Sequence, residues 1–332
     1  MNGRFEFLLG LPALRPGALW LRATSLGAPV LISANALSRW RVDGLGLRHW
    51  DGFDARHLGL VFHHRVVLDS AGFVAASRYR GFPWSTLDYL DLAAAAPWFW
   101  WAAQDWCVEP EVAGDEDAVL DRISGTVRPN MVCLRGGERR GITDRFVPVL
   151  QGWHPHHYLR CLERMPWVLD FPLVGIGSMC RRHVHGQHGI LHVLDVLDRA
   201  FSGSDARWHL FGLKSQAIAV AAQHPRVASS DSQAYGVAAR QDARKARTSK
   251  CDAMVATTMT RWHQQQLAAI SARLSLPPSQ TWASPPDTAP KSPIEARIAA
   301  AMEHLRELHE YGEIDWADVS PIAAFEMAFL VD

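Results

Sequence analysis

Four polar residues stand at or just beyond the ends of short apolar runs, and their side chains can do chemistry. They are Asp69, Asp105, Gln151 and Asp231. Carboxylates that converge from different strands can serve as acid, base, nucleophile or metal ligand, so the set predicts a catalytic centre. The alternative for each single aspartate is a cap on the helix or turn that follows it.

Glycines accompany these polar residues. Four of them lie beside the set or at the end of a further apolar run: Gly72, Gly152, Gly175 and Gly177. Glycine lets a ligand approach the backbone closely, which favours a binding pocket at these positions. None belongs to a G-x-G-x-x-G or P-loop pattern, so the sequence indicates no nucleotide cofactor.

Histidines and one cysteine raise the alternative of a metal site. Five potential ligands lie within thirteen residues: Cys180, His183, His185, His188 and His192. Their spacing fits neither a C-x-x-C ribbon nor H-E-x-x-H, and Arg181 and Arg182 would repel a cation. Zinc is therefore not favoured, and we expect no cofactor. A second group, His154, His156 and His157, is expected to line a loop, with substrate contact as the alternative.

The elements that position these residues follow from hydrophobic patterning. Short apolar runs typical of strands buried on both faces occupy residues 30–33, 60–62, 65–69, 98–101, 131–134, 146–151, 171–178, 208–212 and 226–231. Helical stretches lie between them at residues 85–96, 155–165, 188–201 and 214–224. Alternation of strand and helix with about eight strands predicts a (β/α)8 TIM barrel, and a doubly wound open sheet is the alternative.

The chain changes character after the barrel, which is expected to span residues 1–240. Residues 241–250 are basic and residues 258–274 could form a helix. A Pro-rich linker follows at 276–293 and an amphipathic helix at 294–311. We expect residues 241–332 to form an appended, mostly helical segment packed on the barrel.

Charge and cysteine content limit the class of protein. The 332 residues hold 34 basic and 34 acidic side chains, which argues against a wholly cationic nucleic-acid binder. The charges are segregated, because residues 226–250 hold six basic against two acidic residues, whereas 303–332 hold one against eight. Five scattered cysteines and no apolar stretch of membrane-spanning length favour a cytoplasmic protein without membrane contact.

Five motifs resemble the guanine transglycosylase superfamily, in the family's order. They are Asp69-Ser70-Ala71-Gly72-Phe73, Gln104-Asp105-Trp106-Cys107, Val149-Leu150-Gln151-Gly152, Val174-Gly175-Ile176-Gly177-Ser178, and His209-Leu210-Phe211-Gly212 followed by residues 229–232. The superfamily comprises the tRNA-guanine transglycosylases and their DNA-modifying relatives of the DpdA type. Its members are TIM barrels that exchange guanine in a polynucleotide for a 7-deazaguanine base.

The resemblance implies a role for each motif. Asp231 would be the nucleophile that forms a covalent intermediate with the sugar, and Asp69 the general acid and base. The base would be bound by Asp105, Gln151, Gly152, Gly175, Gly177, Ser178 and Phe73. Phosphates would meet Arg240, Arg244, Lys245 and Arg247. Trp106 and Trp153 could cover the flipped base, or they could be core residues.

Two departures from the family pattern bear on the substrate. Ala71 stands where the family has glycine, which is expected to narrow the base pocket. The C-x-C-x-x-C and His zinc module of the tRNA enzymes is absent, since Cys251 is the only cysteine after Cys180. We therefore expect a glycosyltransferase that acts on DNA rather than tRNA, with a 7-deazaguanine such as preQ0 as incoming base and proteins of a DNA-modification system as partners.

Three alternatives stay open at this point. The first is a related enzyme that acts on RNA. The second is a metal-dependent TIM-barrel hydrolase with Asp69, Asp105 and histidines as ligands. The third is a nucleic-acid-binding protein with a decayed catalytic site.

Overall fold

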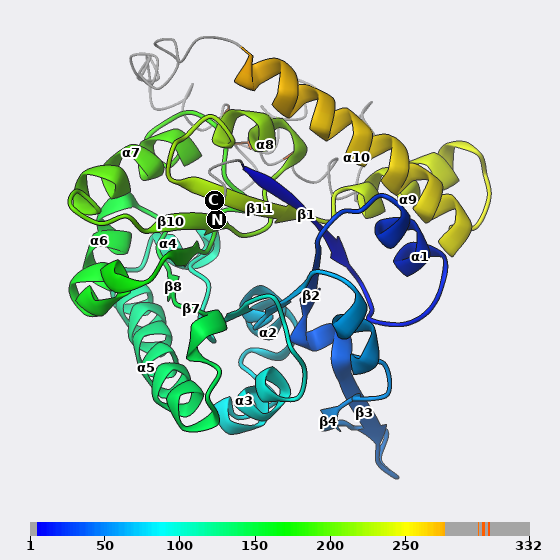
Figure 1. The fold of residues 1–332 in the computed structure, drawn as a ribbon, viewed down its shortest axis with the longest axis horizontal. Coiled ribbons are helices and arrows are strands. Elements are labelled where there is room, and N and C mark those ends of the chain that lie inside the picture. Colours follow the sequence, from blue (N-terminus) through cyan, green and yellow to red (C-terminus); the bar gives the residue numbers. More distant parts are fainter. Residues whose placement is uncertain (1–4, 276–297, 299–300, 303–304, 306–332) are drawn as a thin grey trace.

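A parallel sheet curled into a barrel forms the centre of the computed structural model, which describes residues 5–275, 298, 301, 302 and 305 (Figure 1). The strands of this sheet are β1 (Glu6–Leu11), β2 (Val30–Ser33), β5 (Val66–Asp69), β6 (Trp101–Ala102), β7 (Phe146–Val147), β8 (Val149–Leu150), β9 (Leu173–Ile176), β10 (Arg207–Leu210) and β11 (Val227–Ser232). Their order is β7-β6-β5-β2-β1-β11-β10-β9-β8, and all neighbours are parallel. Most of their side chains are buried, as expected for strands covered on both faces.

The barrel closes through a single interrupted strand. β7 pairs with β6, β8 pairs with β9, and only Pro148 separates β7 from β8 along the chain. Proline has no N–H to donate, so the ladder breaks there while the chain continues in the same direction. With β7 and β8 counted as one, eight strands form a closed ring. This confirms the predicted TIM barrel and excludes the open sheet.

Helices cover the outside of the barrel between successive strands (Figure 1). They are α1 (Ala18–Ser25), α2 (Gly72–Tyr79), α3 (Thr86–Ala94), α4 (Pro110–Ala113), α5 (Glu116–Arg140), α6 (Pro155–Glu163), α7 (Ile190–Ala200), α8 (Ser215–Ala221), α9 (Tyr235–Lys245) and α10 (Asp252–Leu274). Short 3-10 helices are η1 (Ala34–Leu37), η2 (Leu58–His63), η3 (Thr143–Arg145) and η4 (Pro166–Asp170). The predicted helices at 85–96, 155–165, 188–201 and 214–224 are confirmed as α3, α6, α7 and α8.

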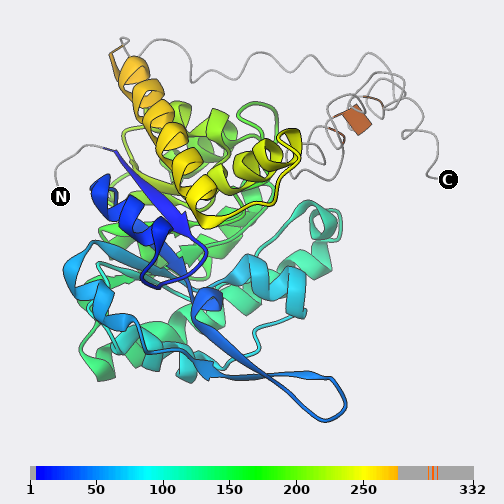
Figure 2. The ribbon, with the colours of Figure 1, turned by 90° about the vertical axis from the view of Figure 1, so that its right-hand side faces the viewer.

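The connection after β2 differs from the others. In place of an α-helix it carries η1, the antiparallel pair β3 (Ser38–Val42) and β4 (Arg48–Phe53), and η2. This hairpin projects away from the barrel body (Figure 2). Since β2 is a parallel barrel strand, its following loop emerges at the same end of the barrel as the other strand carboxyl ends.

Two predicted strands are wrong. Residues 131–134 lie inside α5, where Ile123, Asn130 and Cys133 are buried at a helical spacing of three to seven residues. Residues 60–62 belong to η2, and Phe62 is 67% exposed. β1 was not predicted from the sequence. It pairs with β2 and β11 and is one of the eight strands of the barrel.

The segment after the barrel begins without a break. The expected boundary between residues 240 and 241 falls inside α9, and α10 then packs against α1, α8 and α9 (Figure 1). The Pro-rich linker, the acidic tail and nearly all of the helix expected at 294–311 lie outside the described residues. None of the helices in the described part has the length and apolar composition needed to cross a bilayer.

Candidate active site

A cavity of about 660 Å³ opens at the carboxyl ends of the barrel strands. Every strand position of the ring contributes to its wall, which includes Leu11, Ser33, Asp69, Asp105, Gln151, Gly177, Phe211 and Asp231. Its volume is typical of sites that enclose a small ligand. The four polar residues predicted to converge do meet here, although they come from β5, β11 and the segments just beyond β6 and β8.

Asp231 is held from one side. Its Oδ1 accepts a hydrogen bond from the backbone N–H of Gly212 at 2.8 Å and lies 3.3 Å from Nε2 of His209. His209 is buried, and its Nδ1 lies 2.8 Å from the hydroxyl of Ser229. If that hydroxyl donates to Nδ1, the ring proton sits on Nε2 and donates to Asp231. Both hydrogen bonds go to Oδ1, so Oδ2 is the oxygen that can react.

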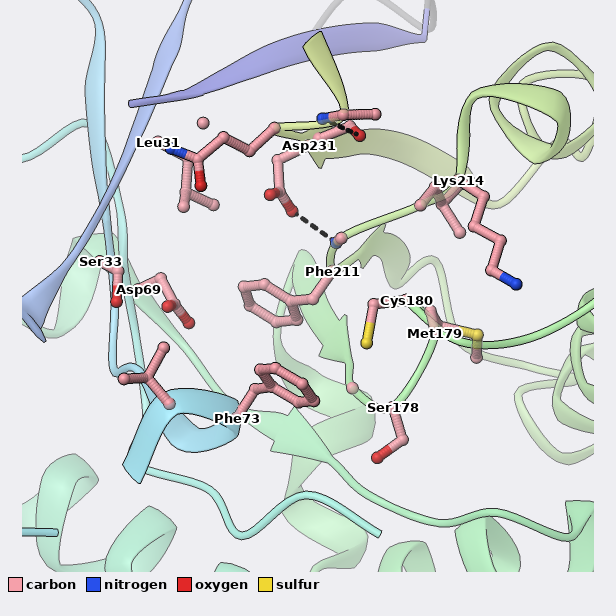
Figure 3. A pocket seen from close by; sticks show the side chains of 18 of the residues that line it. Leu31, Ser33, Asp69, Phe73, Ser178, Met179, Cys180, Phe211, Lys214 and Asp231 are labelled. Carbon is pink, nitrogen blue, oxygen red and sulfur yellow. Dashed lines mark hydrogen bonds between the residues drawn. The ribbon is translucent and has the colours of Figure 1, made fainter. Parts of the chain in front are cut away.

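Asp69 lies in a different environment. Its Oδ2 accepts a hydrogen bond from the backbone N–H of Ala71 at 3.0 Å. Burial, reinforced by the negative charges of Asp105 and Asp231, raises the pKa of Asp69 to about 7. This carboxyl can therefore hold a proton near neutrality, which suits a general acid. In Figure 3 the carboxyl groups of Asp69 and Asp231 both point into the cavity.

Asp105 belongs to a buried hydrogen-bond network. The hydroxyl of Ser70 donates to its Oδ1 at 2.6 Å, and the side-chain amide of Gln151 donates to its Oδ2. Oε1 of Gln151 accepts from the hydroxyl of Ser178 at 2.7 Å, and that hydroxyl accepts from the N–H of Val108 at 2.9 Å. Burial raises the pKa of Asp105, and the donors Ser70 and Gln151 oppose that rise. The network fixes the orientation of Asp105 before any ligand arrives.

Two of the predicted glycines make room for this network. A Cβ on Gly72 would lie 2.5 Å from the carbonyl oxygen of Asp105 and 2.8 Å from its Oδ1. A Cβ on Gly177 would lie 2.0 Å from Nε2 of Gln151. Both glycines line the cavity, so any side chain at either position would displace the groups that face a ligand.

The other two predicted glycines lie elsewhere. Gly152 faces the side chains of His157 and Tyr158, and Gly175 faces Phe211 and Val149. Neither belongs to the cavity wall. These glycines permit close packing of helix and strand behind the site, and the structure does not bring them to the ligand space.

Aromatic side chains form an apolar part of the wall. Phe73, which was predicted, and Phe211 both project into the cavity (Figure 3). Such rings can stack on a base, worth about 1–3 kcal/mol per base in nucleic-acid complexes. Trp106 and Trp153 are not part of the wall; Trp106 packs beneath Arg122, and Trp153 beneath Arg182.

Sequence reasoning missed several residues of the wall. Glu109 is 7% exposed, and its Oε2 has no hydrogen-bond partner within the described structure. Burial, partly offset by Arg181 and Arg182, raises its pKa to about 7. Lys214 brings a cation to the rim (Figure 3). Glu109 stands four residues after Asp105, and Lys214 stands two residues after Gly212. Their closeness to the motifs in the sequence was the signal that could have found them.

Two thiols in the wall are not activated. Burial raises the pKa of both Cys107 and Cys180. Because the thiolate is the nucleophilic form of cysteine, the raised pKa values do not favour either thiol as a nucleophile.

The histidines predicted as alternative metal ligands lie outside the cavity. In residues 5–275, the single group whose potential ligand atoms gather within 4.8 Å of one another is Glu116, His156 and His157. Arg160 pairs with the same Glu116 at 2.7 Å, which disfavours a cation there. Asp69 and Asp105 form no such group with histidines, so the geometry gives the metal-dependent hydrolase no support.

The predicted phosphate contacts are exposed and lie apart from the cavity. Arg240, Arg244 and Lys245 are on α9, and Arg247 follows it. α9 itself lines the cavity through Val237, Ala238 and Gln241, and Arg244 and Lys245 follow one turn later along the helix. The basic residues are thus carried by the helix that borders the site, but they are exposed and do not line the cavity.

The barrel and its three carboxylates define a TIM-barrel protein with a cluster of carboxylates in a cavity at the strand ends. A comparison with protein families matches residues 15–288 to DpdA, DeoxyPurine in DNA protein A, and the chain belongs to this family. This confirms the resemblance to the DNA-modifying branch of the tRNA-guanine transglycosylase-like superfamily. A comparison with curated proteins finds no match.

Proposed function

We propose that the protein replaces guanine in DNA with a 7-deazaguanine base such as preQ0, through a covalent intermediate between Asp231 and the sugar. The observation that carries the proposal is the convergence of Asp69, Asp105 and Asp231 on one cavity, each with a different set of partners. Membership in the DpdA family supports DNA as the polynucleotide.

The first half of the reaction breaks the bond between C1′ and the base. Oδ2 of Asp231 attacks C1′, while Asp69 gives its proton to the leaving guanine. Gly212 and His209 hold Oδ1, so the attacking oxygen needs little reorientation. The products are neutral guanine, a sugar ester on Asp231 and an ionised Asp69, with retention expected after the second displacement.

The second half reverses these roles. Ionised Asp69 takes the N9 proton of the incoming base, whose nitrogen attacks C1′ and releases Asp231 as a carboxylate. Asp69 is then protonated again, and no water or other co-reactant is consumed. A pKa of about 7 suits a group that must both give and take a proton near neutrality.

Base recognition falls to Asp105 and its neighbours. Each oxygen of Asp105 already accepts one hydrogen bond, and its remaining lone pairs can accept from N1–H and N2–H of guanine. Gln151 has both ends of its amide engaged, so we assign it to positioning Asp105 rather than to direct reading of the base. Phe73 and Phe211 would stack on the base plane.

Glu109 is suited to read the substituent on the incoming base. A nitrile accepts but cannot donate a hydrogen bond, and a carboxyl with a pKa of about 7 can donate to it. We expect Glu109→Leu to weaken use of the 7-cyano base by about tenfold, the scale of one lost hydrogen bond, while exchange of guanine for labelled guanine is retained. Equal loss with both bases would remove Glu109 from substituent recognition.

The test of the proposed function is direct. Purified protein is incubated with isotope-labelled guanine or preQ0 and with duplex DNA, single-stranded DNA or tRNA, and the nucleosides are analysed by mass spectrometry. We expect label in deoxyguanosine positions of DNA. Label in tRNA alone would replace the DNA assignment by the RNA alternative, and no label in any polymer would contradict the proposal.

A further inference from the structure

The β3–β4 hairpin begins at the wall of the cavity. Ser33, the last residue of β2, lines the cavity, and only the four residues of η1 separate it from β3. From there the hairpin extends beyond the barrel body (Figure 2). Its five-residue strand β3 is roughly 16 Å long at ~3.3 Å per residue. The hairpin therefore stands at the mouth of the cavity, where a polynucleotide with one base in the cavity can meet it.

The tip of the hairpin is fixed by one side chain. Oδ1 of Asp43 accepts the backbone N–H groups of Leu45 and Leu47, both at 2.9 Å, and Oδ2 lies 2.6 Å from Nε2 of His49. Gly46 provides the left-handed conformation that the turn requires, with a φ of 80°. The tip is thus a preorganised turn.

The same tip exposes apolar side chains. Leu45 is 86% exposed, Val42 60% and Leu47 57%. A rigid turn that holds aliphatic side chains in water points to a surface that is covered when a partner binds.

The strands below the tip carry three arginines and one aspartate, so they are positively charged, and they are anchored at their base. Arg39, Arg41, Arg48 and Asp51 are all exposed on the two strands, and the guanidinium of Arg48 lies 5.0 Å from the ring of Trp40. At the base, Trp50 packs against Phe53 and Trp84, with ring centroids 5.1 Å and 6.1 Å apart. The base of the hairpin is therefore packed against Trp84, a residue of the hydrophobic core.

We infer that the hairpin enters the major groove of duplex DNA and that Leu45 and Leu47 wedge into the base stack where the target guanine leaves it. The inference rests on the proposed function for its substrate. A two-stranded ribbon fits the major groove, which is about 8.5 Å deep, so a hairpin of this length reaches the base edges. Arginines along the strands meet the phosphates, and aliphatic side chains at the tip fill the space between unstacked bases.

The experiment compares duplex and single-stranded DNA of the same sequence. The double variant Leu45→Ser with Leu47→Ser is expected to lose about tenfold or more of kcat/KM on the duplex, because extrusion of a paired base is no longer assisted. Exchange on the single strand should stay within about twofold of the unmodified protein. Leu21→Ser, at a 65% exposed leucine on α1, is the matched control and should change neither.

A second measurement reports opening without chemistry. With Asp231→Asn, fluorescence of 2-aminopurine next to the target guanine should rise when the protein binds the duplex. The rise should be lost when Leu45→Ser and Leu47→Ser are combined with Asp231→Asn in the same chain. Arg41→Gln should reduce the salt dependence of duplex binding.

The outcomes separate the two proposals. Equal losses on duplex and single strand, no loss on either, or a change of oligomeric state in place of a duplex-specific loss would overturn the wedge. A hairpin-dependent fluorescence rise without any base exchange would support the wedge and contradict the proposed function.

Discussion

The two proposed catalytic aspartates come from β5 and β11, which β2 and β1 separate in the barrel, and each accepts a hydrogen bond from the backbone of a residue in the left-handed conformation. The N–H of Ala71, with a φ of 73°, donates to Asp69, and the N–H of Gly212, with a φ of 69°, donates to Asp231. Both aspartates thus accept a hydrogen bond from the backbone in the same way, but their surroundings differ. Asp231 also contacts His209, whereas Asp69 is half-buried and feels the negative charges of Asp105 and Asp231.

The comparison teaches how one cavity can assign different roles to the same residue type. Desolvation, together with the neighbouring carboxylates, raises the pKa of Asp69 and favours its protonated form, which fits an acid. Hydrogen bonds confined to Oδ1 orient Asp231 and leave Oδ2 to attack. The environment rather than the side chain decides the chemistry.

The largest expected effect on base exchange comes from substitution of Asp231. Asp231→Asn removes the attacking oxygen, so we expect base exchange to fall by at least ~10⁴-fold, the scale of losing a nucleophile. Protein trapped with substrate and denatured should show a DNA adduct by mass spectrometry only when Asp231 is present. Asp195→Asn, at an exposed aspartate of α7 that pairs with Arg199, is the control and should retain exchange. An adduct in the Asp231 variant would place the nucleophile elsewhere.

The next largest effect on base exchange is expected from substitution of Asp69. Asp69→Asn should slow exchange by about 10²–10⁴-fold, the range for loss of general acid–base catalysis. In the unmodified protein kcat/KM should decline as pH rises through about 7, because Asp69 then loses the proton that it donates. A profile of the Asp69 variant that keeps this decline would assign it to another group.

The same pKa predicts a pH dependence of stability. The carboxyl binds its proton more tightly in the folded than in the unfolded chain, so stability falls as pH rises from about 4 to about 7. Asp69→Asn should remove this part of the slope and make the protein more stable than the unmodified chain at pH 8. Urea unfolding at pH 5 and pH 8 measures the difference, and parallel slopes for both proteins would contradict it.

A smaller effect is expected from the residue behind Asp231. His209→Phe keeps ring packing against Trp100 and Phe211 but removes the contact with Asp231. We expect a loss of about 10–10²-fold in kcat with KM little changed, because misplacement of a reacting group costs on this scale. His224→Phe, at a buried histidine stacked on Trp208 away from the cavity, is the control. Equal losses of kcat in both variants would show that His209 contributes by packing and not through its contact with Asp231.

The smallest effects are expected on stability, from substitutions at the two residues in the left-handed conformation. Ala71→Gly should raise the free energy of unfolding by roughly 0.5–1 kcal/mol, because alanine is strained at positive φ. Gly212→Ala should lower it by about 1–2 kcal/mol, since the new Cβ is strained and meets the Cβ of Cys180 at 3.0 Å. Thermal unfolding measures both, and shifts of the same sign would show that backbone strain is not the cause.

Much of the site could be predicted because parallel strands end at one edge. Asp69, Asp105, Gln151 and Asp231 each end or follow an apolar run, so their convergence follows from the barrel alone. His209 escaped prediction because nothing in its local sequence says that it faces Asp231 across two neighbouring strands. The strand predicted at 131–134 failed because a short apolar run fits a buried helix face as well as a strand.

By itself the sequence determined the barrel, the motif order and the residue types at the strand ends, because these depend on hydrophobic periodicity and on local spacing. Only the tertiary structure decided which carboxyl keeps a proton, which glycines face the ligand, and where the β3–β4 hairpin stands. The physical reason is that pKa values, steric contacts and exposure depend on neighbours far apart in the chain, as with Asp69, Asp105 and Asp231.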